Sequence, residues 1–460
     1  MERRDLFKLT GLGIAAAATT TLTGCAGQPD APSAMMSAKS LLPKSTGKRV
    51  VIIGGGFGGL TAAKYIRKQD KSVEVIVLEK RDIFMSCPFS NALLGGLEDV
   101  TLDTLTHDLY SGASNHGYEL IQSTVTDIDA NKKMVHTNLG SIDYDILLLS
   151  PGIAYDYKGQ FPTWSDAKIR EVQQKAPAAM MAGSEHLALK RMLDDMDDGN
   201  IIITKPNGKY RCPPAPFERA SMIANYMEKE EIEGKVIILN SSEGISKGAA
   251  FKESWKDLYS SKLEHRDNCT ILDVDFDKGI ITYNQVVGVD KDEEDILEKK
   301  TEKFAVLNLI PQNIANPVVQ MAGVETTNDS FGKVKMNGAS FRTKSHKDIY
   351  AVGDVVGHAI PPSGQTANWS AKQAAGEIIA ALNGKSYKLD LPYKTANVCF
   401  SMVGDGPEEA IMVTHDFSFN GSVIKGKGNV PKTGGTKYRS KNTAKATREW
   451  YRGIMDDMFL

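Results

Sequence analysis

KRVVIIGGGFGGLTAAKYIRKQDKSVEVIVLEKRD, residues 48–82, is the stretch of sequence that decides the fold. The apolar run at 50–53 predicts a strand and the glycines after it predict a turn. Residues 58–68 then predict a helix, and residues 73–78 predict a second strand. A strand, a crossover helix and a second strand make one βαβ unit, which is typical of a Rossmann-like parallel sheet.

The glycines of this stretch have a spacing that suits a dinucleotide. Gly54, Gly56 and Gly59 form GxGxxG between the strand and the helix. The first glycine permits the turn, the second lets the backbone meet a pyrophosphate, and the third lets helix and strand pack closely. Glu79 ends the second strand, where its carboxylate would accept hydrogen bonds from a ribose. Together these residues predict dinucleotide binding.

Two later segments favour FAD over NAD as the dinucleotide. YDILLLSPG (144–152) is an apolar strand that ends in a tight turn at Gly152, and SHKDIYAVGD (345–354) is a strand that ends in Gly353 and Asp354. Both resemble the later motifs of the two-dinucleotide-binding-domain flavoproteins, in which the terminal aspartate meets the ribityl or pyrophosphate part of FAD. Taken alone, Asp354 could equally be a turn residue. Following the glycine loop in this order, it predicts an FAD site.

Composition limits the class of protein. At about 150 residues per domain, a chain of 460 residues is long enough for roughly three structural units. Its 55 basic and 57 acidic residues nearly cancel, so the overall charge does not indicate a nucleic-acid partner. The five cysteines are too few and too scattered for a disulfide scaffold, and none has the CxxC spacing of a metal site. We therefore expect no metal, and each cysteine has to be interpreted from its own neighbours.

The N-terminus predicts export. Arg3 and Arg4 precede an apolar, alanine-rich run of about 15 residues, which is too short to span a bilayer. The paired arginines followed by DLFK resemble the twin-arginine pattern of proteins that fold with their cofactor before crossing the membrane. LTGC, which ends at Cys25, also resembles a lipobox; the alternative is a plain signal cleaved near residues 31–38. Residues 1–25 are thus predicted to be the signal peptide of a periplasmic protein, with a lipid on Cys25 as its membrane anchor if the lipobox is used.

Residues 156–299 predict a second α/β unit that lacks a nucleotide loop. The loop KPNGKYRCPPAPFERA (205–220) does not supply the glycine spacing, and its prolines have no N–H group to offer a pyrophosphate. We therefore expect that NAD(P)H is not the electron donor. The loop instead brings Cys212 to a helix entrance, where the helix dipole and Arg211 would favour a thiolate. A buried structural cysteine is the alternative.

Five segments resemble one family closely. They are MSCPFSNALLGG (85–96), YRCPPAPFERAS (210–221), LNLIPQN (307–313), IPPSGQTANWSAKQAA (360–375) and ANVCFSMVGDG (396–406). They resemble the flavoprotein subunit of flavocytochrome c sulfide dehydrogenase, within the wider sulfide:quinone oxidoreductase family. The resemblance runs from about Gly47 to the C-terminus.

The resemblance implies an α/β fold with two Rossmann-like three-layer domains of the FAD/NAD(P)-linked reductase type plus a C-terminal α+β domain. By this likeness the FAD-binding domain is discontinuous and consists of residues 46–155 and 300–390. The second Rossmann-like domain lies at 156–299, and residues 391–460 form a C-terminal domain that faces the flavin or a partner.

The resemblance also implies different roles for the cysteines. Cys87 corresponds to the residue that carries FAD through a thioether to the 8α-methyl group, with a free thiol and noncovalent FAD as the alternative. Cys212 and Cys399 correspond to a redox-active disulfide beside the flavin. Cys269 matches no motif, and we interpret it as structural.

The implied reaction is the two-electron oxidation of sulfide or of another small thiol. Hydrosulfide would attack one sulfur of the Cys212–Cys399 disulfide, as in thiol–disulfide exchange, and the electrons would pass to the flavin. Glu218 is a candidate proton acceptor, with a solvated helix carboxylate as the alternative. Backbone N–H groups from Gly364 to Thr366, at a helix entrance, would stabilise negative charge on the flavin.

The electron acceptor stays open at this point. The chain has no CxxCH and therefore no c-type haem of its own, and the resemblance implies a separate c-type cytochrome. Sulfide:quinone oxidoreductases instead dock on the bilayer through amphipathic C-terminal elements, to which WYRGIM (450–455) is a weak counterpart. Asp456 and Asp457 argue against an anionic membrane face. A flavin electron-transfer protein without a substrate is a further alternative, which the presence of both Cys212 and Cys399 disfavours.

Overall fold

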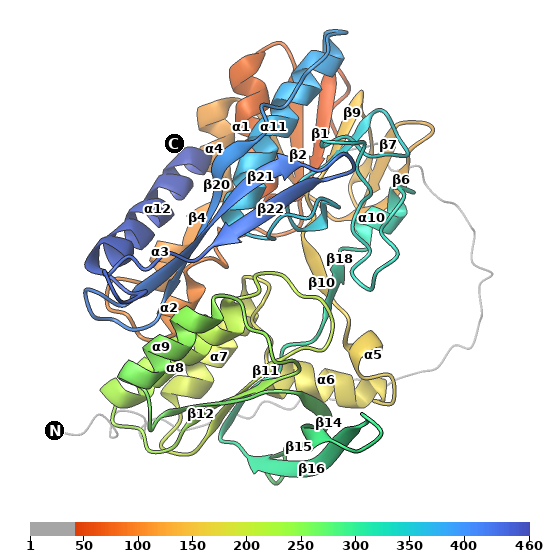
Figure 1. Ribbon diagram of the computed structural model, residues 1–460. Coiled ribbons are helices and arrows are strands. Elements are labelled where there is room, and N and C mark those ends of the chain that lie inside the picture. The colour runs from red at the N-terminus through yellow and green to blue at the C-terminus, as the bar shows by residue number, and fades with distance from the viewer. Residues whose placement is uncertain (1–41) are drawn as a thin grey trace, which may run out of the picture. The chain divides into compact units, whose positions relative to one another are not determined.

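The computed structural model describes residues 42–460. The predicted signal peptide at 1–25, with Cys25, lies outside the described residues. The described part has an α/β fold with two parallel sheets, each accompanied by helices, and a C-terminal antiparallel sheet with one long helix (Figure 1).

The first unit is built on a five-stranded parallel sheet in the order β19-β9-β1-β2-β5. Its strands are β1 (Arg49–Ile53), β2 (Glu74–Glu79), β5 (Glu119–Gln122), β9 (Ile146–Leu149) and β19 (Ile349–Ala351). β1 is central and buried along its whole length, as expected for a parallel strand covered on both faces. β19 pairs with β9, so two segments far apart in the sequence share one sheet.

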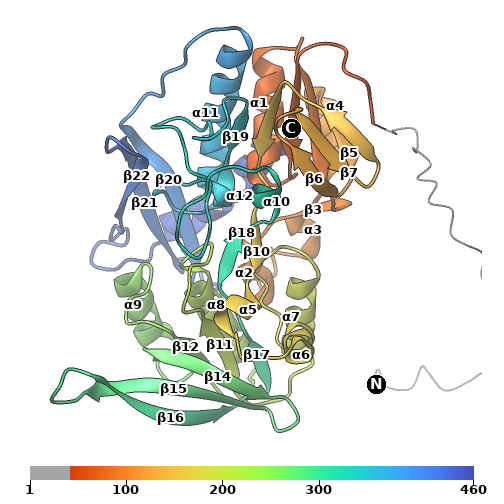
Figure 2. The same cartoon turned by 90° about the vertical axis from the view of Figure 1, so that its right-hand side faces the viewer.

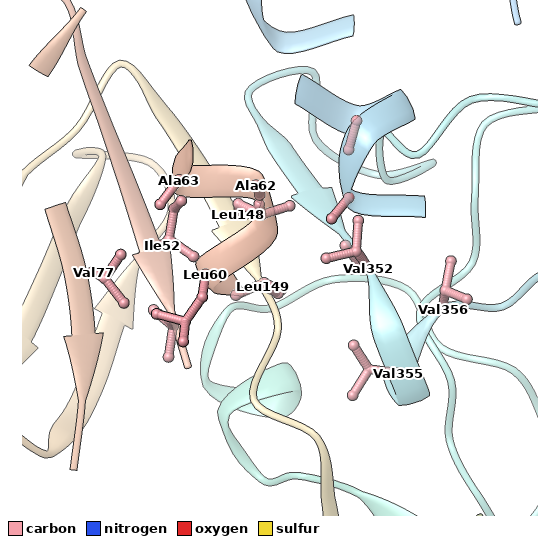
Figure 3. Close-up of a cluster of buried hydrophobic side chains, with 14 of the residues drawn as sticks. Ile52, Leu60, Ala62, Ala63, Val77, Leu148, Leu149, Val352, Val355 and Val356 are labelled. Carbon is pink, nitrogen blue, oxygen red and sulfur yellow. The ribbon is translucent and has the colours of Figure 1, made fainter. Parts of the chain in front are cut away.

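Helices α1 (Phe57–Gln69) and α11 (Gly364–Leu382) pack against each other beside this sheet (Figure 2). Figure 3 shows part of the core between them and the strands, where Ile52, Leu60 and Leu148 are fully buried. Burying one such aliphatic side chain stabilises a fold by roughly 1.5–3 kcal/mol. The βαβ unit predicted from residues 48–82 is therefore a central part of the first core.

The second unit is a four-stranded parallel sheet in the order β13-β12-β11-β17. Its strands are β11 (Ile201–Lys205), β12 (Val236–Asn240), β13 (Leu263–Arg266) and β17 (Val306–Asn308), and its helices are α7 (Ser184–Asp194), α8 (Ala215–Lys229) and α9 (Gly248–Leu258). β17 pairs with β11, so this sheet extends beyond the expected boundary at residue 299. α8 begins at Ala215, because Pro214 at the N-cap and Pro216 in the first turn suit a helix start.

An antiparallel sheet lies on the second unit and contains β14 (Cys269–Asp275), β15 (Ile280–Val289) and β16 (Asp295–Lys303). The first and second units are joined by a two-stranded ribbon of β10 (Ile153–Tyr155) and β18 (Asn313–Ala315).

The C-terminal unit contains an antiparallel sheet of β20 (Tyr393–Met402), β21 (Ala410–Phe419) and β22 (Ile424–Asn429), followed by α12 (Lys441–Phe459). Tyr451, Ile454 and Met455 of α12 are buried, and the helix packs against α1 and α4 (Leu109–His116). The apolar face of α12, considered above for docking on a bilayer, is thus covered by the protein's own core. No helix in residues 42–460 is long and apolar enough to cross a membrane.

Short elements complete the described chain. They are β3 (Ile83–Met85), α2 (Ser90–Leu94), α3 (Leu102–Leu105), β4 (Thr106–Asp108), α4 (Leu109–His116), β6 (Val125–Asp129), β7 (Met134–Thr137), β8 (Gly140–Asp143), α5 (Tyr157–Gln160), α6 (Asp166–Lys175), α10 (Val318–Met321) and the 3-10 turn η1 (Gly353–Val355).

Candidate functional site

One cavity is lined by residues from all three units, and most of the predicted site residues lie on its wall. These are Gly54, Gly56, Glu79, Cys87, Gly152, Cys212, Glu218, Gly353, Asp354, Gly364 and Cys399. Gly59 and Thr366 are not on the wall. Residues from positions 54 to 399 therefore surround one space, although their roles in binding and catalysis stay predictions.

The glycine turn between β1 and α1 suits the close approach of a phosphate group. A Cβ atom added at Gly56 would meet no protein atom within 4 Å, so the backbone faces open space in the cavity. A Cβ atom at Gly59 would instead overlap the carbonyl oxygen of Gly54, which explains why helix and strand can pack closely only with glycine there. The two glycines therefore do different things: Gly56 leaves room for a ligand and Gly59 leaves room for the fold.

Glu79 lies at the end of β2 beside this turn. Its Oε2 accepts a hydrogen bond from the Gly55 amide at 2.5 Å, and its Oε1 is paired with Arg81 at 3.0 Å. Burial acts to raise the pKa of Glu79, but the contacts with Arg81 and the Gly55 amide outweigh it and lower the pKa overall. The group is therefore a carboxylate, the form that accepts hydrogen bonds from ribose hydroxyls.

Asp354 lies in η1, directly after β19, and its carboxylate is paired with Arg211 across the cavity wall. Nη1 of Arg211 donates to Oδ2 of Asp354 at 3.2 Å. Because of this ion pair, the loop that carries Cys212 is anchored to the segment expected to hold the cofactor. The glycine turn, Glu79 and Asp354 form a wall that fits FAD.

Cys87 lies in the turn between β3 and α2. Its Sγ is 3.3 Å from the carbonyl oxygen of Met180, to which it donates, and 3.9 Å from Nε2 of His186. Burial, helped by the nearby Arg219, lowers the pKa of His186 to about 3, so this imidazole is neutral. Cys87 is therefore held on the cavity wall by a carbonyl and a neutral histidine, while its thioether bond to FAD stays a prediction.

Cys212 and Cys399 reach the cavity from the loop before α8 and from β20. Both are free thiols in the structure, so their disulfide stays a prediction. Burial raises the pKa of Cys212 well above its ordinary value, and the nearby Cys399 and Glu218 raise it further. The expected thiolate at Cys212 is therefore wrong: the side chain is desolvated, and Arg211 is directed to Asp354 instead.

Lys247 was not identified from the sequence and is buried next to Cys399. It is the N-cap residue of α9, with a left-handed φ of 59°, and only 6% of its surface is exposed. Its Nζ donates to Oγ of Ser401 at 2.6 Å and contacts the carbonyl oxygen and Sγ of Cys399 at 3.3 and 3.8 Å. Ser401 Oγ in turn donates to Glu218 Oε2 at 2.9 Å. A chain of polar contacts thus connects the candidate proton acceptor to one sulfur of the pair.

Glu218 itself is buried, not a solvated helix carboxylate, because its helix face packs against β20. Burial raises the pKa of Glu218, and the nearby Lys247 and the hydrogen bond from Ser401 partly offset this increase. A buried carboxyl group with a raised pKa can hold and release a proton near the two cysteines.

Two further expectations are changed by the structure, and the interpretation of Cys269 as a structural residue is not. The Thr366 amide donates to Oγ of Ser363 at 3.1 Å, so it caps α11 and is not a free donor to the flavin. Trp450, part of the weak membrane-docking segment, lies on the cavity wall, where its Nε1 donates to Gln365 at 2.7 Å. Cys269 lies outside this cavity; it is buried in β14, and burial raises its pKa to about 12.

No three His, Cys, Asp or Glu side chains within residues 42–460 gather in a way that could hold a metal ion. Close to the dinucleotide turn, the thiols of Cys212 and Cys399 lie near the carboxyl group of Glu218, and the amine of Lys247 contacts Cys399 from beside the cavity.

Family models match three parts of the chain. The family described as "Sulfide dehydrogenase (flavocytochrome c) flavoprotein chain, central" matches residues 186–311, and "Flavocytochrome c sulphide dehydrogenase, flavin-binding" matches residues 392–459. "Pyridine nucleotide-disulphide oxidoreductase" matches residues 48–175. The flavin-binding match and the dinucleotide turn together identify FAD as the cofactor.

Individual relatives agree with these families. The sulfide dehydrogenase (flavocytochrome c) flavoprotein chain of Chlorobaculum thiosulfatiphilum is 56% identical over 46 residues, which are 10% of this chain and 96% of that sequence. The mitochondrial sulfide:quinone oxidoreductase of Mus musculus is 23% identical over 318 residues, 66% of this chain and 65% of that protein. The X-ray structure of the Aquifex aeolicus sulfide:quinone oxidoreductase has the same fold, with a TM-score of 0.68 at 17% identity, covering 90% of this chain and 91% of that one.

Proposed function

The chain belongs to the family of flavocytochrome c sulfide dehydrogenase flavoprotein chains, and on this basis we propose that it oxidises hydrosulfide at Cys212 and Cys399 and passes the electrons through FAD to a separate c-type cytochrome. The observation that carries the proposal is the meeting of these two cysteines, from different units, in the cavity that also holds the dinucleotide turn. Two cysteine sulfurs beside a two-electron cofactor can take up sulfide as a persulfide and pass two electrons on.

The proposed reaction begins as a thiol–disulfide exchange. HS⁻ attacks one sulfur of a Cys212–Cys399 disulfide, which leaves a persulfide on that cysteine and a thiolate on the other. FAD supplies an acceptor for two electrons. Glu218, buried and linked through Ser401 to the cysteine pair, holds the proton that hydrogen sulfide gives up as it enters in its neutral form.

We also propose that Cys87 carries FAD through a thioether. Support comes from its position on the cavity wall, in the turn before α2, and from the resemblance of its segment to the thioether site. A covalent cofactor would suit an exported protein, because it cannot be lost by dissociation outside the cell. Export to the periplasm through the twin-arginine signal, with a lipid on Cys25 where the lipobox is used, belongs to the same proposal.

The c-type cytochrome is proposed as acceptor because the matched family bears the flavocytochrome c name and the sequence has no CxxCH of its own. A quinone acceptor would need a surface that docks on a bilayer. Two observations argue against such a role for the segment at 450–455. The apolar face of α12 is buried, and Trp450 faces the cavity.

The test is anaerobic reduction of the purified holoprotein by sulfide, followed as bleaching of flavin absorbance. Cys212→Ser and Cys399→Ser should each retain FAD and lose bleaching, since neither can form the S–S bond. Because the two cysteines act as a unit, the double variant should be scarcely worse than either single one. Cys269→Ser, outside the cavity, is the matched control and should bleach normally.

The acceptor is tested in the second half-reaction. Sulfide-reduced protein is mixed with a c-type cytochrome or with a soluble quinone, and reoxidation should be fast only with the cytochrome. A single cysteine variant that bleaches at the parental rate would mean that sulfide reaches the flavin directly. Faster reoxidation by the quinone would overturn the choice of acceptor.

A further inference from the structure

The buried ammonium group of Lys247 contacts Cys399 and makes no hydrogen bond with Cys212 among the described residues. A lysine has three N–H donors, and at Lys247 three acceptors lie within reach: Oγ of Ser401, the carbonyl oxygen of Cys399 and Sγ of Cys399. Two of these contacts are to a single cysteine.

From this geometry we propose that Lys247 is a positioning residue that stabilises Cys399 as the thiolate, so that the disulfide opens with Cys399 as the leaving sulfur and Cys212 as the sulfur that hydrosulfide attacks. The inference rests on the proposed function and adds a direction to it. In a thiol–disulfide exchange, the sulfur that is more stable as a thiolate leaves faster, so one adjacent cation is enough to select it.

The step balances without a further reactant. HS⁻ forms a new S–S bond to Sγ of Cys212, and the bond between Cys212 and Cys399 breaks. The negative charge that arrived on hydrosulfide ends on Cys399, beside Nζ of Lys247. The disulfide is reduced by two electrons, and the incoming sulfur is oxidised to the outer atom of a persulfide.

The surroundings of the pair support this direction. Burial raises the pKa of both thiols, and Lys247 lowers both. At Cys399, Lys247 is the largest influence after burial and exceeds the opposing influence of Glu218. At Cys212, the influences of Cys399 and Glu218, which raise the pKa, both exceed that of Lys247. Two other titratable groups near Lys247 also have shifted pKa values. Burial raises the pKa of Glu218, and burial together with Lys247 lowers the pKa of His415 on β21.

The left-handed backbone conformation at Lys247 also indicates that surrounding contacts hold this residue in place. A residue other than glycine is strained at a φ of 59°, and such strain persists only where the surroundings hold it. Here the N-cap position of α9 points the side chain inward, away from solvent, where its Nζ meets β20.

Two measurements test the proposal. First, the disulfide is reduced with dithiothreitol without sulfide, and each cysteine is labelled with iodoacetamide at pH 7 and counted by peptide mass spectrometry. Cys399 should label faster than Cys212, and in Lys247→Met its labelling should slow by about tenfold, the effect of losing one adjacent opposite charge. Lys247→Arg, which keeps the charge, should restore most of the rate.

Lys205→Met is the matched control. Lys205 is a partly buried lysine of the same unit whose Nζ contacts Ser241 and Ser242, so its loss should leave the labelling of Cys399 unchanged. Equal labelling of the two cysteines in the parent protein, or an unchanged Cys399 rate in a folded Lys247→Met variant, would overturn the proposal. The parent comparison decides the matter if Lys247→Met does not fold.

The second measurement locates the sulfur. The parent protein is mixed anaerobically with one equivalent of sulfide, quenched with iodoacetamide after a short time, and digested. The extra sulfur should appear on the Cys212 peptide, and extra sulfur on the Cys399 peptide would refute the proposed direction. Because the labelling experiment uses no sulfide, failure of the proposed function, seen as no bleaching by sulfide, is distinguishable from failure of the role of Lys247.

Discussion

Replacing Gly56 by alanine should weaken FAD binding without damaging the fold. Gly56 has an extended backbone, with φ −95° and ψ −166°, which alanine also adopts. The added Cβ would meet no protein atom within 4 Å, so it would project into the space that the pyrophosphate is expected to fill. The substitution should therefore reduce the free energy of FAD binding and leave the stability of the protein core unchanged.

The magnitude follows from the size of that intrusion. Forcing one extra carbon into a well-packed contact costs about 1–3 kcal/mol. At 1.4 kcal/mol for each factor of ten, FAD should bind about 5- to 150-fold more weakly. Gly59→Ala should behave differently, because its Cβ would overlap the carbonyl oxygen of Gly54 and separate α1 from β1. We expect that variant to yield little folded protein.

The assay is FAD titration of the apoprotein, followed by quenching of flavin fluorescence, in a Cys87→Ser background that makes binding reversible. Circular dichroism checks that Gly56→Ala is folded. Gly453→Ala, on the exposed side of α12 and also without a neighbour within 4 Å, is the control and should keep the parental Kd. If Gly56→Ala binds FAD as tightly as the background protein, the pyrophosphate does not approach this turn and our placement of the cofactor is wrong.

Three further predictions can be checked directly. The flavin should stay with the pellet after acid precipitation and should be released in Cys87→Ser; a colourless parent pellet would contradict the thioether. NADH and NADPH should not reduce the flavin in stopped-flow experiments, because Pro213 and Pro214 occupy the loop where a second pyrophosphate would need amides; rapid bleaching by either would contradict this. Burial raises the pKa of Glu377 from 4.5 to about 7, so its contribution to stability is complete below pH 4.5 and lost as the pH rises through 7. The free energy of unfolding of Glu377→Gln, measured by urea denaturation, should therefore equal that of the parent near pH 4 and exceed it by up to about 3 kcal/mol at pH 8. A difference between the two proteins that shrinks with rising pH would contradict this prediction.

The sequence predicted local structure better than contacts between distant segments. The first βαβ unit was predicted within a residue or two, because the apolar period and the glycine turn are both local signals. The two later FAD motifs, at 144–152 and 345–354, contain β9 and β19, which pair in the same sheet as the glycine turn. Lys247 could not be predicted, because it comes within reach of Cys399 only when α9 and β20 pack together, and nothing in the residues around it marks a buried ammonium group.

Some errors came from applying a local rule without its tertiary context. A helix entrance and a neighbouring arginine suggested a thiolate at Cys212, but Arg211 turns toward Asp354 and the thiol is desolvated. In the same way, the aromatic segment around Trp450 suggested a surface, whereas the packing of α12 turns this indole into the cavity. Exposure and side-chain direction are properties of the packed molecule, and the linear pattern does not contain them.

The order of the cavity residues along the chain has a consequence for biosynthesis. The FAD turn is translated first, Cys212 follows, and Cys399 on β20 emerges only after both parallel sheets have been made. A nascent or truncated chain that ends before β20 contains every strand of the two parallel sheets but only one sulfur of the pair. Such a chain would lack one half of the proposed disulfide, so we expect it to be unable to oxidise sulfide through the cysteine pair even where it binds FAD.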